Sequence, residues 1–290
     1  MTSEAASDDK AAVAFCADLV RSHDFVRYAA TIFVPADIRR ALLALYAFNV
    51  EITRVRDQVS QALPGEIRLQ WWTDMLAGHA HGSAEGNSVA AELMQVVSVA
   101  ELPVERLSRL IEEHQFDLYN DPMPTMAALE AYLNDTSSAL FALAARIAGG
   151  PPSPEVDHLA RHAGLAQGFV RVVAMLGYDA VRRQLFLPQQ VLAQQGSDLE
   201  EVFAGKLTPR LRGAIDQLLA DASRHLDTAY ALLGDVPEQV RPVFLPLAVV
   251  RRDLKRLSRA DNDPFAPQLP SRLSTLWTLW RASRSRQFGG

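Results

Sequence analysis

The sequence predicts an all-α protein built as one helical bundle. Apolar residues recur at the three- and four-residue spacing of helices along almost the whole chain, whereas the alternating runs typical of strands are scarce. Hydrophobic residues make up 49% of the 290 residues, which is enough to bury a large core, and no internal repeat is present. We therefore expect a single domain over residues 10–285, with a flexible tail over 1–9 and a second tail over 286–290.

The first half of the chain predicts six helices. Val13, Cys16 and Val20 give the first helix an apolar face, and the break at Phe33-Val34-Pro35 separates it from the second. Pro64 suits the first turn of the third helix, because the N–H that proline lacks is not needed there. A small, polar segment over 78–87 predicts an exposed loop. The six expected helices cover residues 10–21, 37–59, 64–76, 89–100, 104–119 and 126–148.

The second half predicts five more helices. Pro151 and Pro152 form a stiff turn rather than a domain linker, because dense apolar periodicity resumes directly after them. The expected helices cover residues 154–176, 189–195, 208–233, 237–259 and 271–285. Together the eleven segments are typical of a single bundle.

Charge is distributed unevenly along the chain. Residues 251–290 hold nine Lys/Arg against three Asp, a balance of +6, so the preceding 250 residues carry −11 of the net charge of −5. A basic segment on an acidic body favours contact with an anionic membrane or an acidic partner, although a solvated face explains it as well. Trp277 and Trp280 lie among these arginines and fit either core packing or contact with a membrane interface. Nothing in the composition points to nucleic acid.

Cysteine usage and hydropathy indicate the compartment. Cys16 is the only cysteine, so no intramolecular disulfide can form. The N-terminus leads into an acidic stretch rather than a basic and then apolar leader, and no run of about 18 apolar residues occurs. We expect a protein of the cytoplasm, with peripheral attachment at the inner face of the membrane.

Two segments resemble the signatures of the squalene and phytoene synthase family. The first holds Pro35, Arg39 four residues later, and Tyr46-Ala47-Phe48 seven residues after that. The second runs from Gly164-x-Ala166-Gln167 to Phe186-Leu187-Pro188. The resemblance covers roughly residues 22–283. It implies an isoprenoid-synthase-type helical bundle around a central cavity, which in active relatives holds two prenyl diphosphates.

Within these segments the family's metal-binding carboxylates are mostly replaced. The Asp-x-x-x-Asp motif of the family falls on Thr53 and Asp57, and its second set of Asn and two Asp falls on Val170, Ala174 and Tyr178. Ionisation of an allylic diphosphate needs Mg²⁺ held between phosphate and carboxylate oxygens, which two Asp at i and i+4 supply from one helical face. The sequence therefore predicts that this metal cluster is incomplete.

Asp57, Glu51 and Asp179 are the residual acids of the implied site. Six residues along a helix rotate Glu51 roughly 120° away from Asp57. Asp179 has Met175 at its i−4 position, and Arg54, at i−3 to Asp57, can neutralise that carboxylate as a helix-surface ion pair. We therefore assign no catalytic residue, and Asp57 is the one candidate metal ligand.

The resemblance also implies contacts to an anionic or polar substrate. Guanidinium groups form forked hydrogen bonds with phosphate, although a surface arginine can equally be solvated. The candidates for this role are Arg39, Tyr46, Gln167, Arg171, Arg182 and Arg183.

The residues at 46–60, 67–72 and 178–188 resemble those of the branch of the family that contains the mitochondrial respiratory complex I assembly factor. This implies a protein that has lost prenyl diphosphate condensation, needs no cofactor, and acts on a respiratory complex subunit or assembly intermediate, with a cavity that can hold a prenyl lipid. The rival is an active Mg²⁺-dependent head-to-head prenyl transferase that joins two farnesyl or geranylgeranyl diphosphates through Asp57, Glu51 and Asp179. A soluble helical adaptor with a filled core is the third interpretation.

Overall fold

The computed structural model describes residues 2–79, 86–150, 152–266 and 271–288, and the regular elements within them are all helical. In chain order they are α1 (Thr2–His23), α2 (Phe25–Ala30), η1 (Thr31–Phe33), α3 (Ala36–Thr53), α4 (Val55–Gln58), α5 (Ala62–Leu76), α6 (Ser88–Val99), α7 (Val104–Glu113), η3 (Phe116–Leu118), α8 (Met126–Leu133), the π-helix η4 (Asn134–Ser138), α9 (Ala139–Ile147), α10 (Pro154–Ala174), α11 (Leu176–Val181), α12 (Gln189–Gln194), α13 (Leu199–Phe203), α14 (Pro209–Leu232), η5 (Glu238–Phe244), α15 (Pro246–Leu257), α16 (Arg272–Ser283) and η6 (Arg286–Phe288).

The all-α prediction is confirmed, and its boundaries change where a helix breaks. Helix α1 starts at Thr2, before the expected start at Lys10. The helix expected over 37–59 ends at Thr53, and a separate short helix, α4, begins at Val55. The segment expected as one helix over 237–259 begins as a 3₁₀ helix, because Pro242 lies inside it and cannot donate a helical hydrogen bond.

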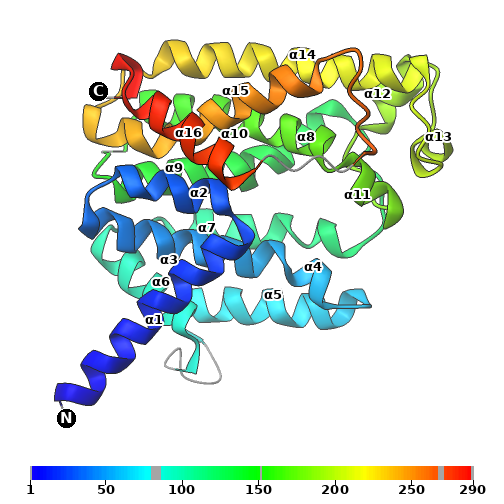
Figure 1. Ribbon diagram of the computed structural model, residues 1–290. Helices are drawn as coiled ribbons and strands as arrows, with labels where there is room; N and C mark the ends of the chain where they lie inside the picture. The colour runs from blue at the N-terminus through cyan, green and yellow to red at the C-terminus, as the bar shows by residue number, and fades with distance from the viewer. Residues whose placement is uncertain (1, 80–85, 151, 267–270, 289–290) are drawn as a thin grey trace.

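Helix α10 is the centre of the bundle. It packs against α14, α9 and α15, and Figure 1 shows α14 along one side of the molecule and α5 along the opposite side. The largest fully buried side chains include Phe48, Phe169 and Phe244, and Phe244 stacks on Phe141 with ring centroids 5.4 Å apart. A single apolar core therefore connects the N-terminal and C-terminal helices.

Two glycines let α10 approach the segment from α8 to α9 closely. A Cβ at Gly164 would lie 2.3 Å from the Cα of Ser138, and a Cβ at Gly168 would lie 2.3 Å from a methyl group of Leu133. At this contact the helix expected over 126–148 contains the π-helical turn Asn134–Ser138. Such turns are common at functional sites. This one supplies Thr136 and Ser137 to the wall of a cavity.

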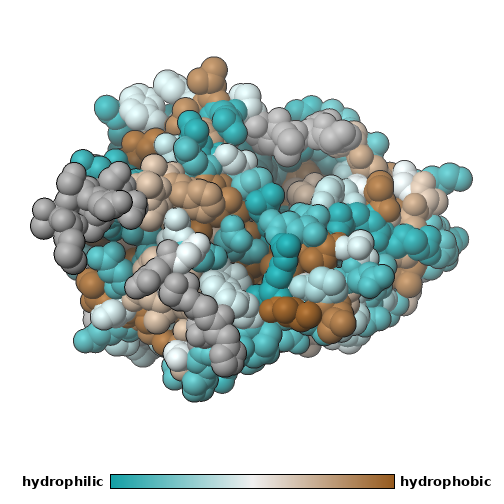
Figure 2. All heavy atoms as spheres, turned by 90° about the horizontal axis from the view of Figure 1, so that it is seen from below, coloured by the Kyte–Doolittle hydropathy of each residue, from teal (hydrophilic) through white to brown (hydrophobic). Residues whose placement is uncertain are grey.

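The outer surface mixes polar and apolar residues. Figure 2 shows that, on the face seen from below Figure 1, apolar residues form several small groups separated by hydrophilic ones. Within the described part of the chain, no helix combines the length and the apolar character that crossing a bilayer requires.

Candidate functional site

A cavity of about 500 Å³ opens between the two halves of the bundle. Its walls come mainly from α2, α3, α4, α8, η4, α10, α11 and α15, with single residues from α1, η3 and α9. Thr53 and Asp57 line it from the first of the two family-like segments, and Val170, Ala174 and Tyr178 line it from the second. The cavity therefore lies where the resemblance places the metal-binding residues.

Four of these five cavity positions carry no carboxylate. The Thr53 hydroxyl donates to the Val50 carbonyl of its own helix at 3.3 Å, so it is engaged within α3. Val170 and Ala174 offer no metal ligand at all. Among the described residues, no group of three or more His, Cys, Asp or Glu side chains is arranged to hold a metal ion.

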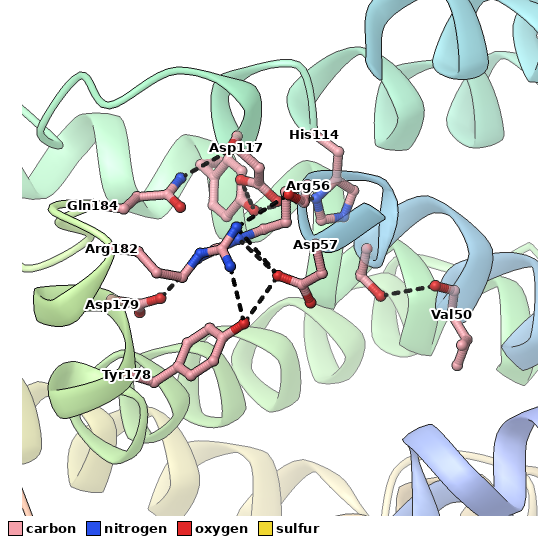
Figure 3. A network of polar contacts seen from close by, with 11 residues as sticks. Val50, Arg56, Asp57, His114, Asp117, Tyr178, Asp179, Arg182 and Gln184 are labelled. Atoms are coloured by element: carbon pink, nitrogen blue, oxygen red, sulfur yellow. Dashed lines mark hydrogen bonds and ion pairs between the residues drawn. The ribbon is translucent and has the colours of Figure 1, made fainter. Parts of the chain in front are cut away.

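The remaining acid, Asp57, is held by partners across the cavity mouth. The Tyr178 hydroxyl donates to Asp57 Oδ1 at 3.0 Å, and the Arg182 guanidinium lies 3.5 Å from the same oxygen (Figure 3). Burial and then the hydrogen bond to Asp57 raise the pKa of Tyr178, so this hydroxyl keeps its proton at neutral pH and donates the hydrogen bond. The sequence predicted Arg54 as the partner of Asp57. In the structure, Tyr178 of α11 and Arg182 at the C-terminal end of this helix take that role.

Asp179 is paired with Arg56 in the protein interior. Arg56 Nη2 lies 2.9 Å from Asp179 Oδ1, and the two side chains are 10% and 8% exposed. Burial raises the pKa of Asp179, so this carboxylate depends on Arg56 to remain ionised. Arg56 also lies 3.8 Å from Asp57, which places one guanidinium between the two acids (Figure 3).

A second buried polar cluster adjoins this pair, and the sequence analysis did not predict it. Asp117 accepts a hydrogen bond from the Tyr132 hydroxyl at 2.8 Å and contacts His114 Nδ1 at 2.7 Å. Gln184 donates to the Asp117 backbone carbonyl at 3.1 Å. Burial, then the Asp117 charge, raises the pKa of Tyr132 well above its usual value. His114, Asp117 and Tyr132 all line the cavity, but only the i, i+3 spacing of the first two hints at their contact.

The opposite polar part of the cavity is organised by Arg27. Its guanidinium pairs with Asp24 at 2.5 Å, donates to Gln167 Oε1 at 2.6 Å, and lies 5.7 Å from the ring centre of Tyr46. Gln167 is thus brought to the cavity wall as expected, whereas Tyr46 is buried behind it. Arg171 also lines the cavity and is exposed to it. The sequence did not single out Arg27.

The other candidates lie outside the cavity lining. Arg39 donates to the backbone carbonyls of η1 and the turn after it, at 2.9 Å for Thr31 and 3.2 Å for Val34, and so caps that turn. Arg183 pairs with Glu200 at 3.0 Å on the α13 side. Glu51 lies on α3, before the break at Arg54, and is absent from the residues that line the cavity. Arg182 stands at the rim, where it also donates to the Arg56 carbonyl at 3.1 Å.

Comparisons with known proteins agree with this geometry. The family model described as squalene/phytoene synthase matches residues 20–281. The NADH dehydrogenase (ubiquinone) complex I assembly factor 6 of Rattus norvegicus is 31% identical over 262 residues, which cover 90% of this chain and 78% of that protein. Phytoene synthase 2 of Solanum lycopersicum is 23% identical over 271 residues, covering 90% and 87%. The fold is also similar to the squalene synthase structure from Alicyclobacillus acidocaldarius, with a TM-score of 0.75 at 20% identity, covering 90% and 97%.

Proposed function

The chain belongs to the squalene/phytoene synthase family, and from its altered site we propose that it no longer condenses prenyl diphosphates and acts instead as a respiratory complex I assembly-type factor. The observation that carries the proposal is the 2.9 Å ion pair between Arg56 and Asp179. A cation of the protein itself lies between Asp57 and Asp179, the acids that stand at or beside the positions of the family's metal ligands.

The residues present do not fit a magnesium cluster. Mg²⁺ requires oxygen ligands in octahedral geometry and is bound through carboxylates that are free to coordinate it. Asp57 already accepts from Tyr178, and Asp179 already pairs with Arg56. A divalent cation at either carboxylate would be repelled by the guanidinium groups of Arg56 and Arg182. We derive no catalytic step through a metal.

The named relatives support the assembly role. The rat protein, at 31% identity, is named as an assembly factor of complex I, whereas the tomato phytoene synthase is 23% identical over a similar length. We propose a respiratory complex subunit or assembly intermediate as the partner of this chain. We further propose that it acts in the cytoplasm or at the inner face of the membrane.

The cavity supports a prenyl lipid as its ligand. Much of its wall is apolar, which suits a branched hydrocarbon chain. The apolar lining residues include Val26, Val50, Leu133, Leu140, Val170, Val172, Met175, Phe186, Val249 and Val250.

The polar groups of the cavity favour an uncharged head on that lipid. Arg27 and Arg56 are already neutralised by Asp24 and Asp179, so they offer little net attraction to a diphosphate. A quinone or prenol head adds no charge beside these ion pairs, and its oxygen can still accept a hydrogen bond from an N–H that faces the cavity.

Release of pyrophosphate tests the loss of catalysis. The purified chain is incubated with farnesyl or geranylgeranyl diphosphate, with and without Mg²⁺, beside Asp57→Asn and the control Asp235→Asn, which alters an exposed acid outside the cavity. We expect no release above background from folded protein. Metal-dependent release that Asp57→Asn abolishes and Asp235→Asn retains would instead establish the prenyl transferase.

Analysis of the lipid that copurifies with the protein tests the proposed prenyl ligand. Ala174→Trp fills the cavity from α10, whereas Val181→Trp places the same side chain on the surface, where Val181 is 87% exposed. We expect solvent extracts of the wild type and Val181→Trp to contain a prenyl lipid that Ala174→Trp lacks. No lipid in any extract would favour the adaptor with a filled core.

The active transferase remains the second candidate because part of the site is retained. Asp57 is 40% exposed at the cavity mouth, and the Arg171 guanidinium is exposed to the cavity, where it could meet a phosphate. The pyrophosphate assay separates this candidate from the assembly role.

A further inference from the structure

Helix α16 presents large apolar side chains to solvent. Leu273, Trp277 and Trp280 are 78%, 59% and 39% exposed. Their spacing of four and three residues places them on one face of the helix. By contrast Trp72 is 4% exposed in the core, so the exposed indoles are concentrated on α16. A contiguous exposed apolar face marks an interaction surface more often than a scattered leucine does.

The face is held in place by contacts on the other side of the helix. Leu279 is fully buried, Arg252 of α15 donates to the Thr275 hydroxyl at 3.3 Å, and the Arg272 guanidinium lies 4.9 Å from the ring centre of Phe25 in α2. Figure 1 shows α16 lying across α15 and α2 at the surface of the molecule. Because packing fixes its inner side, the outward position of the two tryptophans is a stable property of the fold.

Positive charge accompanies the apolar face along the C-terminal part of α16. From Pro264 to the C-terminus the chain contains four arginines and no acidic residue. Arg281 and Arg284 are exposed, and the Arg284 guanidinium lies 4.5 Å from the ring centre of Trp280. Arg251 and Lys255 of the adjacent α15 are exposed as well. An apolar strip bordered by cations is complementary to a surface that has an anionic outer layer above an apolar interior.

We propose that the Leu273–Trp277–Trp280 face of α16 binds the surface of an anionic lipid bilayer. Indole rings settle at the boundary between headgroups and acyl chains, where the ring is buried and its N–H stays hydrated. The flanking arginines reach the headgroup phosphates with their stems along the apolar layer. The helix lies in the plane of the interface and does not cross the membrane.

This contact would place the cavity beside the membrane. Helices α2 and α15, on which α16 packs, supply Val26, Arg27, Val249 and Val250 to the cavity wall. The membrane proposal itself rests on the α16 surface and does not depend on a cavity ligand or on the assembly role.

Vesicle binding tests the proposal directly. The full-length protein is mixed with vesicles of phosphatidylcholine alone or of phosphatidylcholine with phosphatidylglycerol, and bound protein is measured by sedimentation while tryptophan emission reports burial of the indoles. We expect binding to the anionic vesicles only, weakened by salt, with a shift of emission to shorter wavelength. No binding to either vesicle would overturn the proposal and leave a protein as the occupant of this face.

Paired variants separate the apolar and charged contributions. Trp277→Ser/Trp280→Ser should weaken binding to anionic vesicles by about tenfold or more, and Arg281→Gln/Arg284→Gln should weaken it by roughly tenfold or more. The controls are Val181→Ser and Arg224→Gln, which alter an exposed valine on α11 and an exposed arginine on α14. Equal losses in the controls and the α16 variants would refute the assignment to α16.

Discussion

Arg56 of α4 and Asp179 of α11 form an ion pair 2.9 Å long in which both side chains are almost withdrawn from solvent. Removal of one partner leaves a buried charge without compensation. Arg56→Met should therefore lower the free energy of unfolding by about 3–5 kcal/mol in urea titrations at pH 8. At pH 5 the loss should be smaller, because burial raises the pKa of Asp179 and the unpaired acid can take up a proton.

Two further variants test this explanation. Arg56→Met/Asp179→Leu should recover most of the lost stability, because apolar groups can replace both ends of a buried pair. Arg183→Met breaks the exposed pair with Glu200 and should cost less than about 1 kcal/mol. Equal effects of Arg56→Met and Arg183→Met would contradict the difference in burial.

Gly164 sets the distance between α10 and the π-helical turn. Gly164→Ala would bring its Cβ to 2.3 Å from the Ser138 backbone, so the two segments must move apart. We expect a loss of roughly 1–3 kcal/mol, measured by urea or thermal unfolding. Gly234→Ala is the matched control, because no atom lies within 4 Å of the added carbon. A neutral Gly164→Ala would show that the two segments can separate at little cost.

Tyr132 keeps the buried Asp117 carboxylate satisfied. Tyr132→Phe removes the hydroxyl that donates to Asp117 Oδ1 at 2.8 Å while leaving the ring in place. The free energy of unfolding should fall by about 1–3 kcal/mol, because a buried acceptor loses its partner. Tyr119→Phe, which removes an exposed hydroxyl bonded to Glu66, should have little effect. An equal response of the two tyrosines would refute a special role for the buried cluster.

A chain of three histidines joins α10 to α14. His162 Nε2 lies 3.1 Å from His158 Nε2, and its Nδ1 lies 2.9 Å from His225 Nδ1. Burial, then the neighbouring His225 and His158, lowers the pKa of His162 to about 4. Because the unfolded chain binds this proton more readily, protonation of His162 does not reduce the free energy of unfolding above pH 6.5. Its destabilising effect grows as the pH falls from 6.5 toward 4.

Replacement of His162 checks this pH dependence. His162→Asn should reduce the loss of unfolding free energy between pH 6.5 and pH 4 by on the order of 1 kcal/mol, after allowance for partial solvent screening. His79→Asn, at an exposed position, should leave the slope unchanged. An unchanged slope in His162→Asn would show that other groups control acid unfolding.

Helical periodicity was sufficient to predict the fold class, but it could not place the breaks. The apolar pattern continues through Arg54, so the end of α3 at Thr53 is invisible in the sequence. This break decides the site, because it separates α4, with Arg56 and Asp57, from the face of α3. The π-helical turn was also unpredictable, since it accompanies a contact with Gly164 that is remote in the chain.

For the site, positions counted from the family's motifs were more reliable than residue type. Thr53, Ala174 and Tyr178 all line the cavity, as the alignment with the family's ligands implied. Two of the arginines proposed as anion contacts lie outside the cavity lining. Arg39 donates to local backbone carbonyls, and Arg183 pairs with the exposed Glu200 carboxylate. The partners that matter, Arg56 with Asp179 and Arg27 with Gln167, lie 123 and 140 residues apart in sequence, and only the folded chain brings them together.

A guanidinium that is part of the polypeptide differs from an ion that has to be captured from solution. Every folded molecule contains Arg56, so the contact between α4 and α11 forms without a divalent cation. Chelators should therefore leave this contact intact. Loss of Arg56 alone would leave the buried Asp179 carboxylate without its cation, so the two residues can be replaced at low cost only together.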